Sequence, residues 1–457
     1  MTLRQGNVAS QAEKETPSRE TAEPSNSKAW LATANMGYGH LRALYPVRSI
    51  SPSEIIEVGD DASTPHTERK LWRRILRLYE FLSRAKSIPV IGRSLFRLLD
   101  FFLRIPSFYP FRDLSKSTFQ VRMLTSSIRK GLCKGMLERI TQSPLPLVTS
   151  FYAPAIAADT QGHPRVFCII CDTDLNRVWV SHDPWESRIE YFAPTGRAAR
   201  RLKAYGVPEN RIHLSGFPLP LELLGNTDLD VLKADLGQRL HYLDPANRFW
   251  PLHERNVNYF LGEDNCRFLN QRKLTITFAV GGAGAQKHIG KKIAMSLREK
   301  LMANQIQLNL VAGTRTEVID FFLDVQEEIN SQSIKVIFGK DFPEYYAKFN
   351  QTLRTTDILW SKPSELSFYC ALGIPIIMTP TIGAQERANR KWLREIQAGF
   401  KQEDPRYTDQ WLFDLINKGR LAEAAWAGFL KARKRGTFNI IDFLQDGTIN
   451  SHSQLIR

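Results

Sequence analysis

The sequence predicts an α/β protein built of two similar halves, each with a mostly parallel sheet covered by helices. Three observations support this: short apolar runs alternate with helical segments, each half opens with a strand, a glycine-rich turn and a helix, and one stretch, 224–271, interrupts the alternation. Such alternation is typical of parallel sheets, because each crossover places a helix on a face of the sheet. A chain of 457 residues, 43% of them hydrophobic, is long enough for two or three domains.

The first half is expected to begin at residue 29. The preceding segment, 1–28, is rich in Ser, Glu, Thr and Gln and has no apolar core, which is typical of a disordered tail and not of a secretory signal. A strand over 29–34 leads into the turn Asn35–His40 and then a helix. The later elements of this half are expected to be strands at 146–150, 165–170, 189–193 and 212–216 and a helix over 195–205.

The second half starts after 224–271, which mixes charged, Asn, Pro and aromatic residues and is expected to be a linker or an insertion. A helix is expected over 287–304 and a shorter one before Gly373. The strands are expected at 274–280, 307–311, 334–338, 356–360 and 373–378. The predicted boundaries are therefore 29–223 for the first domain, 272–430 for the second and 431–457 for a C-terminal tail.

The positive charge is concentrated in one part of the first half. The whole chain carries a formal net charge of +15, and residues 66–140 contain 17 basic and 5 acidic residues, a net charge of +12. Leu, Ile and Phe recur there at helical spacing between the arginines, which predicts basic amphipathic helices suited to an anionic bilayer. The arginines expected to face the membrane are Arg73, Arg74, Arg77, Arg93, Arg97 and Arg104. A solvated helix face is the alternative, and nucleic acid is not expected because no zinc-finger or RNP-like signature is present.

The cysteines favour a reduced, cytoplasmic setting. There are five, an odd and sparse set that does not suit a disulfide framework. Cys168 and Cys171 form a C-x-x-C pair, but they lie in an apolar run that is expected to be a buried strand, where residues three apart face opposite sides. Metal or redox use of this pair is therefore not expected. No apolar run is long enough for a transmembrane helix, so any membrane association is expected to be peripheral.

The glycine-rich turns are candidate phosphate sites. A turn between a strand and a helix lets a ligand approach the backbone, and the first N–H groups of the helix attract anions. Gly281–Gly284 is such a turn, and 360–365 is a second site of this kind, with Pro363 suited to the first helical turn. Neither glycine turn completes a dinucleotide fingerprint, and no G-x-x-x-x-G-K-[ST] motif is present, which argues against an NAD enzyme and a P-loop NTPase.

Four segments together resemble a family of glycosyltransferases with the GT-B fold. This family holds monogalactosyldiacylglycerol synthase, processive diacylglycerol glucosyltransferases and the N-acetylglucosaminyltransferase of peptidoglycan lipid-intermediate synthesis. Residues 34–43 resemble its amino-terminal Gly-Gly-Gly-His loop, and 172–195 resemble its Thr-Asp, His-x-x-Trp and Pro-Thr stretch. Residues 206–218 resemble the end of its first domain, and 357–389 resemble its nucleotide-sugar half with the Gly-Gln-Glu-x-x-Asn motif.

The resemblance implies two Rossmann-like α/β domains facing across a cleft, with the basic helical insertion in the first. It implies an inverting transferase that moves a sugar from a nucleotide diphosphate donor, UDP-sugar most of all, to a membrane lipid or lipid-linked acceptor at the inner face of the membrane. His40 would be the general base, since a helix N-terminus disfavours the protonated imidazole. The acceptor-side candidates are Gly37, Gly39, Asp174, His182 and Trp185. The donor-side candidates are Gly281, Gly282, Gly284, Gly313, Arg315, Ser364, Glu365, Gln385, Glu386 and Asn389.

Departures from the family pattern keep alternatives open. Phe368 stands where the family carries a Glu that holds the donor ribose, and Glu365, one helical turn earlier, is a possible substitute. A sugar-nucleotide epimerase or hydrolase on the same fold and a non-catalytic membrane scaffold are the other two functions considered. No cofactor is expected, because helix ends and backbone N–H groups can hold a diphosphate without a metal. The alternative is Mg²⁺ or Mn²⁺ at the pair Asp172 and Asp174.

Overall fold

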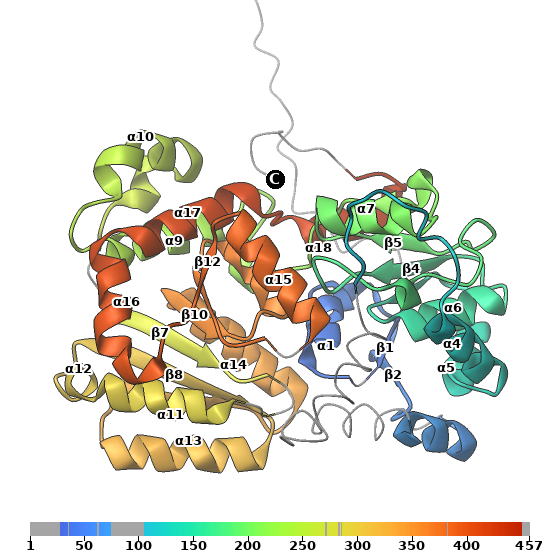
Figure 1. The fold of residues 1–457 in the computed structure, drawn as a ribbon, viewed down its shortest axis with the longest axis horizontal. Coiled ribbons are helices and arrows are strands. Elements are labelled where there is room, and N and C mark those ends of the chain that lie inside the picture. Colours follow the sequence, from blue (N-terminus) through green and yellow to red (C-terminus); the bar gives the residue numbers. More distant parts are fainter. Residues whose placement is uncertain are drawn as a thin grey trace, which may run out of the picture.

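The computed structural model of the chain describes residues 28–34, 36–61, 64–74, 105–269, 272–281, 284, 286–381 and 383–449. It contains two sheets of six strands in which every described pairing is parallel. The sheets belong to two Rossmann-like domains that lie side by side (Figure 1). The predicted fold class, a GT-B arrangement of two such domains, is confirmed. The expected tail before Lys28 and the expected helices between residues 75 and 104 lie outside the described residues.

The first sheet has the strand order β2-β1-β3-β4-β5-β6. Ala32 of β1 is paired with Ile56 on one side and with Thr149 on the other, so the strand order reverses next to β1. The strands are β1 (Trp30–Ala34), β2 (Ile56–Val58), β3 (Leu147–Thr149), β4 (Val166–Ile169), β5 (Glu190–Phe192) and β6 (Ile212–His213). Five of them were predicted from apolar runs, whereas β2 was missed because it is only three residues long.

Helices cover both faces of this sheet. The α-helices are α1 (Tyr38–Leu44), α4 (Phe119–Arg129), α5 (Lys134–Thr141), α6 (Tyr152–Thr160) and α7 (Gly196–Ala204), and the 3₁₀ turns are η1 (Tyr45–Ile50), η2 (Arg177–Trp179) and η3 (Glu209–Arg211). Residues 66–74 are also helical. In that segment Glu68 is buried and accepts hydrogen bonds from the backbone N–H groups of Cys133 and Gly135, both at 2.9 Å, which caps the start of α5.

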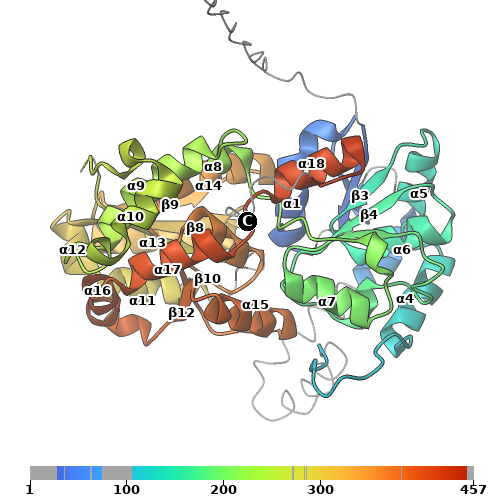
Figure 2. The same cartoon turned by 90° about the horizontal axis from the view of Figure 1, so that it is seen from above.

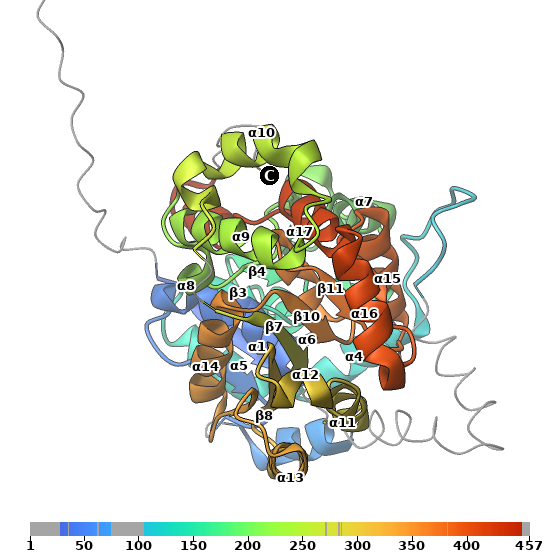
Figure 3. The ribbon, with the colours of Figure 1, turned by 90° about the vertical axis from the view of Figure 1, so that its left-hand side faces the viewer.

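The second sheet has the strand order β12-β11-β10-β7-β8-β9, and the order reverses between β7 and β10. Its strands are β7 (Leu274–Ala279), β8 (Ile306–Gly313), β9 (Ile334–Phe338), β10 (Ile358–Ser361), β11 (Ile376–Met378) and β12 (Gly399–Lys401). Figure 3 shows α9 and α10 at one end of this domain and α11 and α13 at the other. Its helices are α11 (Lys287–Ser296), α12 (Arg298–Met302), α13 (Thr316–Ile329), α14 (Phe342–Arg354), η5 (Glu365–Leu372), α15 (Ala384–Glu395), η6 (Pro405–Tyr407), α16 (Thr408–Asn417) and α17 (Arg420–Lys431).

The segment 224–271 belongs to the second domain. It forms α9 (Asp230–Leu243), α10 (Trp250–Leu261) and η4 (Glu263–Cys266), and α8 (Leu221–Leu224) precedes it. Along α9 the side chains of Leu232, Leu236, Leu240 and Leu243 are buried at helical spacing in the core of that domain. Buried Arg239 donates hydrogen bonds to the carbonyl oxygens of Thr356 (2.7 Å) and Leu372 (2.9 Å) on the other side of the packing interface.

The C-terminal segment is structured, so the expected tail at 431–457 is wrong over its first part. Residues 436–446 form α18 (Gly436–Asp446), which returns to the first domain, as Figures 1 and 2 show. Phe443 packs on Phe192, with ring centroids 5.6 Å apart, and the Asn439 amide donates to the Ser215 carbonyl at 2.7 Å. The apolar spacing of Phe438, Ile440, Ile441 and Phe443 explains why this stretch folds as an amphipathic helix.

The chain thus crosses between the domains twice, and the two crossing segments touch. A Cβ atom placed on Gly436 would lie 2.1 Å from the carbonyl oxygen of Phe217, and one on Gly216 would lie 2.9 Å from the Arg433 Cβ. Only glycine permits this approach of two backbones. The crossing segments are therefore packed against each other between the domains.

Candidate active site

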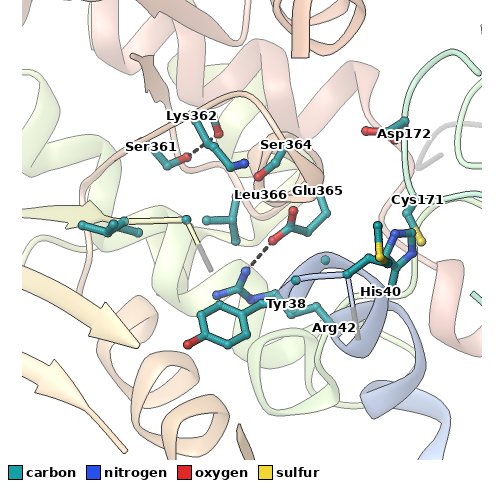
Figure 4. A pocket seen from close by; sticks show the side chains of 16 residues that line it. Tyr38, His40, Arg42, Cys171, Asp172, Ser361, Lys362, Ser364, Glu365 and Leu366 are labelled. Carbon is teal, nitrogen blue, oxygen red and sulfur yellow. Dashed lines mark hydrogen bonds and ion pairs between the residues drawn. The ribbon is translucent and has the colours of Figure 1, made fainter. Parts of the chain in front are cut away.

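Four loops meet around a cavity of about 180 Å³ between the two domains. They follow β1, β4, β7 and β10, at the carboxyl ends of the strands. In open α/β sheets a ligand crevice forms at these ends, where the strand order reverses. The strand order of the first sheet reverses next to β1, and that of the second sheet reverses between β7 and β10. Each sheet is therefore expected to form a ligand crevice at its reversal, and residues from both places line this one cavity (Figure 4).

The loop after β1 carries His40 into this cavity in the first turn of α1. Its Nδ1 lies 2.8 Å from the carbonyl oxygen of Ser150, and a carbonyl can only accept, so Nδ1 carries the proton. The imidazole packs edge-on against Phe151, with ring centroids 4.9 Å apart. Burial lowers the pKa of His40, although the bond to Ser150 and the charge of Glu365 oppose this effect. His40 is therefore a neutral imidazole whose Nε2 can accept a proton.

The predicted glycines of this loop also line the cavity. Gly37 has φ of 113° and is the N-cap residue of α1. A Cβ on Gly39 would lie 2.7 Å from the Glu365 Oε2 of the second domain. A side chain at this position would displace the Glu365 carboxylate, so Gly39 leaves room for that carboxylate in the cavity.

Asp172, in the loop after β4, is the second titratable group on the cavity wall. Burial raises its pKa to about 7, and the hydrogen bond from the Asn389 amide, at 2.8 Å, acts against this shift. Near neutral pH this carboxyl group is therefore partly protonated and can act as an acid as well as a base. Cys171 lies next to it, and burial raises the pKa of the thiol, which makes a thiolate nucleophile unsuitable there.

The second domain supplies a cation and a helix start. A Cβ on Gly281 would lie 2.6 Å from the Lys362 side chain, so this glycine makes room for the lysine. The Lys362 ammonium lies 3.1 Å from the Glu386 carboxylate, and Ser364 is the N-cap residue of η5. Three of the predicted donor-side residues line the cavity: Gly281, Ser364 and Glu365. Glu386 does not line it but contacts Lys362, which does. Gly282 lies outside the described residues.

Glu365 contacts the first domain. Its carboxylate accepts a hydrogen bond from the Arg42 guanidinium of α1, which also donates to the Tyr345 hydroxyl. Arg42 is only 3% exposed, and its charge holds the pKa of Glu365 below the usual range against the opposing effect of burial. Phe368 stacks on Phe217, with ring centroids 4.7 Å apart. The side chain proposed to replace the missing ribose ligand is therefore engaged by an arginine in this conformation.

Two further contacts link the domains at the cavity. The Tyr38 hydroxyl lies 2.8 Å from the Thr314 hydroxyl and accepts from the Thr314 backbone N–H at 2.9 Å, and its ring covers Gly313. The Asn389 Oδ1 accepts from the Thr173 backbone N–H and hydroxyl, both at 2.9 Å. The predicted donor-side residues Gly313 and Asn389 thus face the first domain.

The remaining predicted residues lie away from this cavity. Gln385 is half-buried in the first turn of α15. Arg315 forms an ion pair with Glu317 at 3.6 Å, and a Cβ atom on Gly284 would lie 3.4 Å from the Arg315 side chain. His182 pairs with Asp183 at 3.0 Å on the surface, and Trp185 is 70% exposed. Sequence analysis missed Arg42, Tyr38 and Lys362. Lys362 is part of the Ser-Lys-Pro-Ser segment after β10, where its position before a helix start was the available signal.

The two carboxylates of the D-x-D pair have different surroundings. Asp172 lies on the cavity, whereas Asp174 is buried and receives Arg201 at 2.7 Å and Arg197 at 2.9 Å. Both arginines come from α7, so the pair does not present two free carboxylates to one cation. Within the described ranges, no three His, Cys, Asp or Glu side chains form a group that could hold a metal ion.

Only part of the predicted membrane surface can be placed. Arg73 and Arg74 are exposed at the end of the described helical stretch 66–74, and Arg77, Arg93, Arg97 and Arg104 lie outside the described residues. Among the helices that the structure describes, none is long and apolar enough to cross a bilayer.

Arg42→Gln tests the contact between the domains. The substitution leaves the Glu365 carboxylate buried without its hydrogen-bonded cation, which costs about 3–5 kcal/mol. We expect a lower melting temperature and a larger radius of gyration in small-angle X-ray scattering as the domains separate. Arg48→Gln is the matched control, because Arg48 lies 3.8 Å from Glu222 and both side chains are about half exposed. Equal melting temperatures for the two variants would contradict this role of Arg42.

Comparison with protein-family models and with curated protein sequences gives no match. Comparison with solved structures gives many matches at low sequence identity. S. aureus MnaA with UDP has a TM-score of 0.48 and 11% identity, over 92% of this chain and 96% of that one. A UDP-glucosyltransferase from Polygonum tinctorium has a TM-score of 0.46 and 12% identity, over 93% and 100%. MurG of Acinetobacter baumannii has a TM-score of 0.41 and 14% identity, over 80% and 94%. At these identities the similarity concerns the fold alone.

Proposed function

We propose that the protein is an inverting glycosyltransferase that uses a nucleotide diphosphate sugar and in which His40 is the general base. The observation that carries this proposal is the hydrogen bond between His40 Nδ1 and the Ser150 carbonyl. It fixes the tautomer whose Nε2 is a proton acceptor inside the cavity. An acceptor hydroxyl bound there could give its proton to Nε2 while its oxygen attacks the anomeric carbon in a single displacement.

The second domain offers groups for the leaving diphosphate. Lys362 brings a positive charge to the cavity, and the start of η5 at Ser364 and Gly281, two residues after β7, also line it. Such groups stabilise negative charge that develops on the departing phosphate. The cavity of about 180 Å³ is smaller than the ~300–1,000 Å³ of sites that enclose a drug-sized ligand, so we propose that the domains separate to admit the nucleoside.

The finer parts of the proposal are a UDP-sugar donor, a lipid or lipid-linked acceptor and peripheral attachment to the inner face of an anionic membrane. The donor and acceptor follow from the family resemblance of the sequence motifs. The charge of +12 over residues 66–140 supports the membrane. The test is incubation of the full chain with UDP-, GDP- and dTDP-hexoses and anionic liposomes, with mass spectrometry of the lipid fraction. A glycosylated lipid together with free nucleoside diphosphate is the expected result.

A second candidate is an epimerase or hydrolase that acts on the nucleotide sugar alone. The observation that favours it is Asp172, whose pKa of about 7 places an acid in the same cavity as the base His40. Such an acid–base pair could move protons on one bound substrate. Conversion of the donor in the absence of any lipid would support this candidate. No turnover of any donor would support the non-catalytic scaffold.

Excess EDTA tests the expectation that no metal takes part. Since Arg201 and Arg197 engage the Asp174 carboxylate, we expect sugar transfer to continue at an unchanged rate in EDTA. The measurement is initial rate with and without chelator after extensive dialysis. A loss of activity that Mg²⁺ or Mn²⁺ restores would instead support the metal site at Asp172 and Asp174.

A further inference from the structure

A second cavity, of about 550 Å³, opens on the first domain. The loop 106–118 and the first residues of α4 form one wall, and η2 with Tyr205 forms the other. Asn176, Arg177 and Val178 line this cavity, whereas the next residue, Trp179, lies beside His40 with ring centroids 6.2 Å apart. One turn of chain therefore separates this cavity from the acceptor side of the candidate active site.

The walls of the second cavity carry excess positive charge. Three basic residues line this cavity, Arg112, Lys116 and Arg177, together with one acidic residue, Asp113. The Arg177 guanidinium is 5% exposed and donates to the carbonyl oxygens of Val180 (2.6 Å) and Ser115 (2.8 Å), among others. None of its hydrogen bonds to described residues goes to a carboxylate. Carbonyl dipoles therefore hold this charge, together with the nearby carboxylate of Asp183, which does not line the cavity.

Helix α4 starts at the same cavity. It has 11 residues, and its first turn contains no acidic side chain. The N-cap residue Thr118 makes no capping hydrogen bond, and its hydroxyl is buried with no partner among the described residues. The positive end of the helix dipole therefore points into a basic cavity without an acidic side chain of its own turn to balance it.

Asn176 gives independent support for a ligand. The residue is only 7% exposed and lines the cavity, and its Oδ1 is buried with no hydrogen-bond partner in the described part of the chain. A buried acceptor left unsatisfied costs about 1–3 kcal/mol, so such groups are uncommon in folded proteins. A ligand with a hydroxyl or amino group beside its anionic group would satisfy this oxygen.

Exposed apolar side chains flank the lining of this cavity without being part of it: Phe111 precedes Arg112 in the chain, and Tyr109 lines a neighbouring cavity that shares Pro106. Phe111 is 83% exposed, Tyr109 is 67% exposed, and the two rings are in contact at 5.0 Å between centroids. Met123, on α4, is 52% exposed. Exposed aromatic residues next to basic ones are typical of surfaces that enter the headgroup region of a bilayer. These exposed side chains beside basic residues therefore favour a membrane lipid over a freely diffusing phosphate compound.

We infer that this second cavity binds the phosphate headgroup of an anionic membrane lipid. The start of α4, Arg112 and Lys116 would hold the phosphate, Asn176 would accept a hydrogen bond from the headgroup hydroxyl, and Phe111 and Tyr109 would enter the bilayer. The inference rests on the membrane partner of the proposed function and deepens it. It places lipid recognition at a defined site outside the amphipathic helices expected from the sequence.

The test is binding of the full chain to vesicles of phosphatidylcholine with and without phosphatidylglycerol, measured by co-sedimentation in the absence of any donor. We expect the double variant Arg112→Ala/Lys116→Ala to bind the anionic vesicles roughly 30-fold more weakly, since each basic residue near an anionic surface adds about a fivefold increase in affinity. The matched control is Arg129→Ala/Lys130→Ala, which removes the same charge from the exposed far end of α4. The control is expected to lose less than about threefold.

Asn176→Leu separates a binding role from a structural one. It removes the unsatisfied oxygen at similar size, so the melting temperature should stay equal or rise while the affinity for anionic vesicles falls. A lower melting temperature with unchanged affinity would overturn the inference. Equal losses of affinity in the two double variants would overturn the inference too. So would binding of free glycerol 3-phosphate by a chain that does not bind anionic vesicles. Sugar transfer to a soluble acceptor is assayed separately, so failure here is distinguishable from failure of the proposed function.

Discussion

His40→Ala is expected to lower the turnover number for sugar transfer by roughly 10²–10⁴, the contribution usual for a positioned general base. The variant removes the Nε2 acceptor but leaves the backbone of α1 and the groups of the second domain in place. We therefore expect the affinity for the nucleotide diphosphate, measured by calorimetry, to change less than about threefold. Rate and affinity would be measured on the same preparation.

The matched control is His163→Ala. His163 also lies in the first domain and contacts a backbone carbonyl, that of Leu145, at 2.8 Å, but it does not line the cavity. It should keep full activity. Equal activity of His40→Ala and the wild-type chain would remove His40 from the mechanism.

The pH dependence of the wild-type chain provides a second measurement of the same role. Burial lowers the pKa of His40, so the imidazole stays neutral at pH values where an exposed histidine is already half protonated. A base works only while it is unprotonated. We therefore expect the acidic limb of kcat/KM to be centred below pH 6.5, the ordinary value for a histidine. An acidic limb centred above pH 7 would contradict this assignment.

Asp174→Ala is expected to destabilise the first domain by about 3–5 kcal/mol, the usual cost of removing one partner from a buried ion pair. Asp174 and Arg201 are each only 1% exposed at the side chain, and Arg197 binds the second carboxylate oxygen. Without Asp174 the buried Arg201 guanidinium loses its counter-charge, whereas Arg197 keeps the carboxylate of Glu395 at 3.9 Å. The expected observation is a fall in the melting temperature of roughly 10 °C for a domain of this size.

Glu209→Ala is the control for that measurement, because Glu209 pairs with Lys203 of the same helix, α7, on the protein surface. It should leave the melting temperature unchanged. If Asp174→Ala melts like the wild-type chain but loses activity, the residue belongs to the acceptor side, as the motif resemblance implied, and its ion pairs are of little importance for stability.

The sequence was most informative where an element could be recognised from its own residues. Strand β9 (Ile334–Phe338) has the bounds expected from its apolar run. Strand β12 (Gly399–Lys401) was missed because three residues with one exposed side chain carry no periodic signal. The end of the chain was expected to be a tail, yet α18 packs on residues more than 200 positions away, and that partner cannot be read from a local pattern.

The same distinction applies to the candidate site. His40 was predicted because a strand, a glycine turn and the histidine lie together in residues 29–40 and because residues 34–43 resemble a known family motif. The partner of Glu365 was missed because Arg42 lies 323 positions away, in the other domain. Asp174 was placed on the acceptor side from its motif, whereas its arginines come from the next helix and do not appear in the motif. Contacts of this kind follow from the packing of whole elements and only become visible in three dimensions.

The double crossing of the chain between the domains has a mechanical consequence. Because the backbones meet at Gly216 and Gly436, the domains are joined by two chain segments that touch at one point. We expect a connection of this kind to prevent one domain from sliding along the other. It still allows the domains to rotate as a hinge about the point of contact. The separation needed to admit a nucleoside is therefore expected to be a single swing about this pivot, which returns His40 and Lys362 to the same relative position each time the cavity closes.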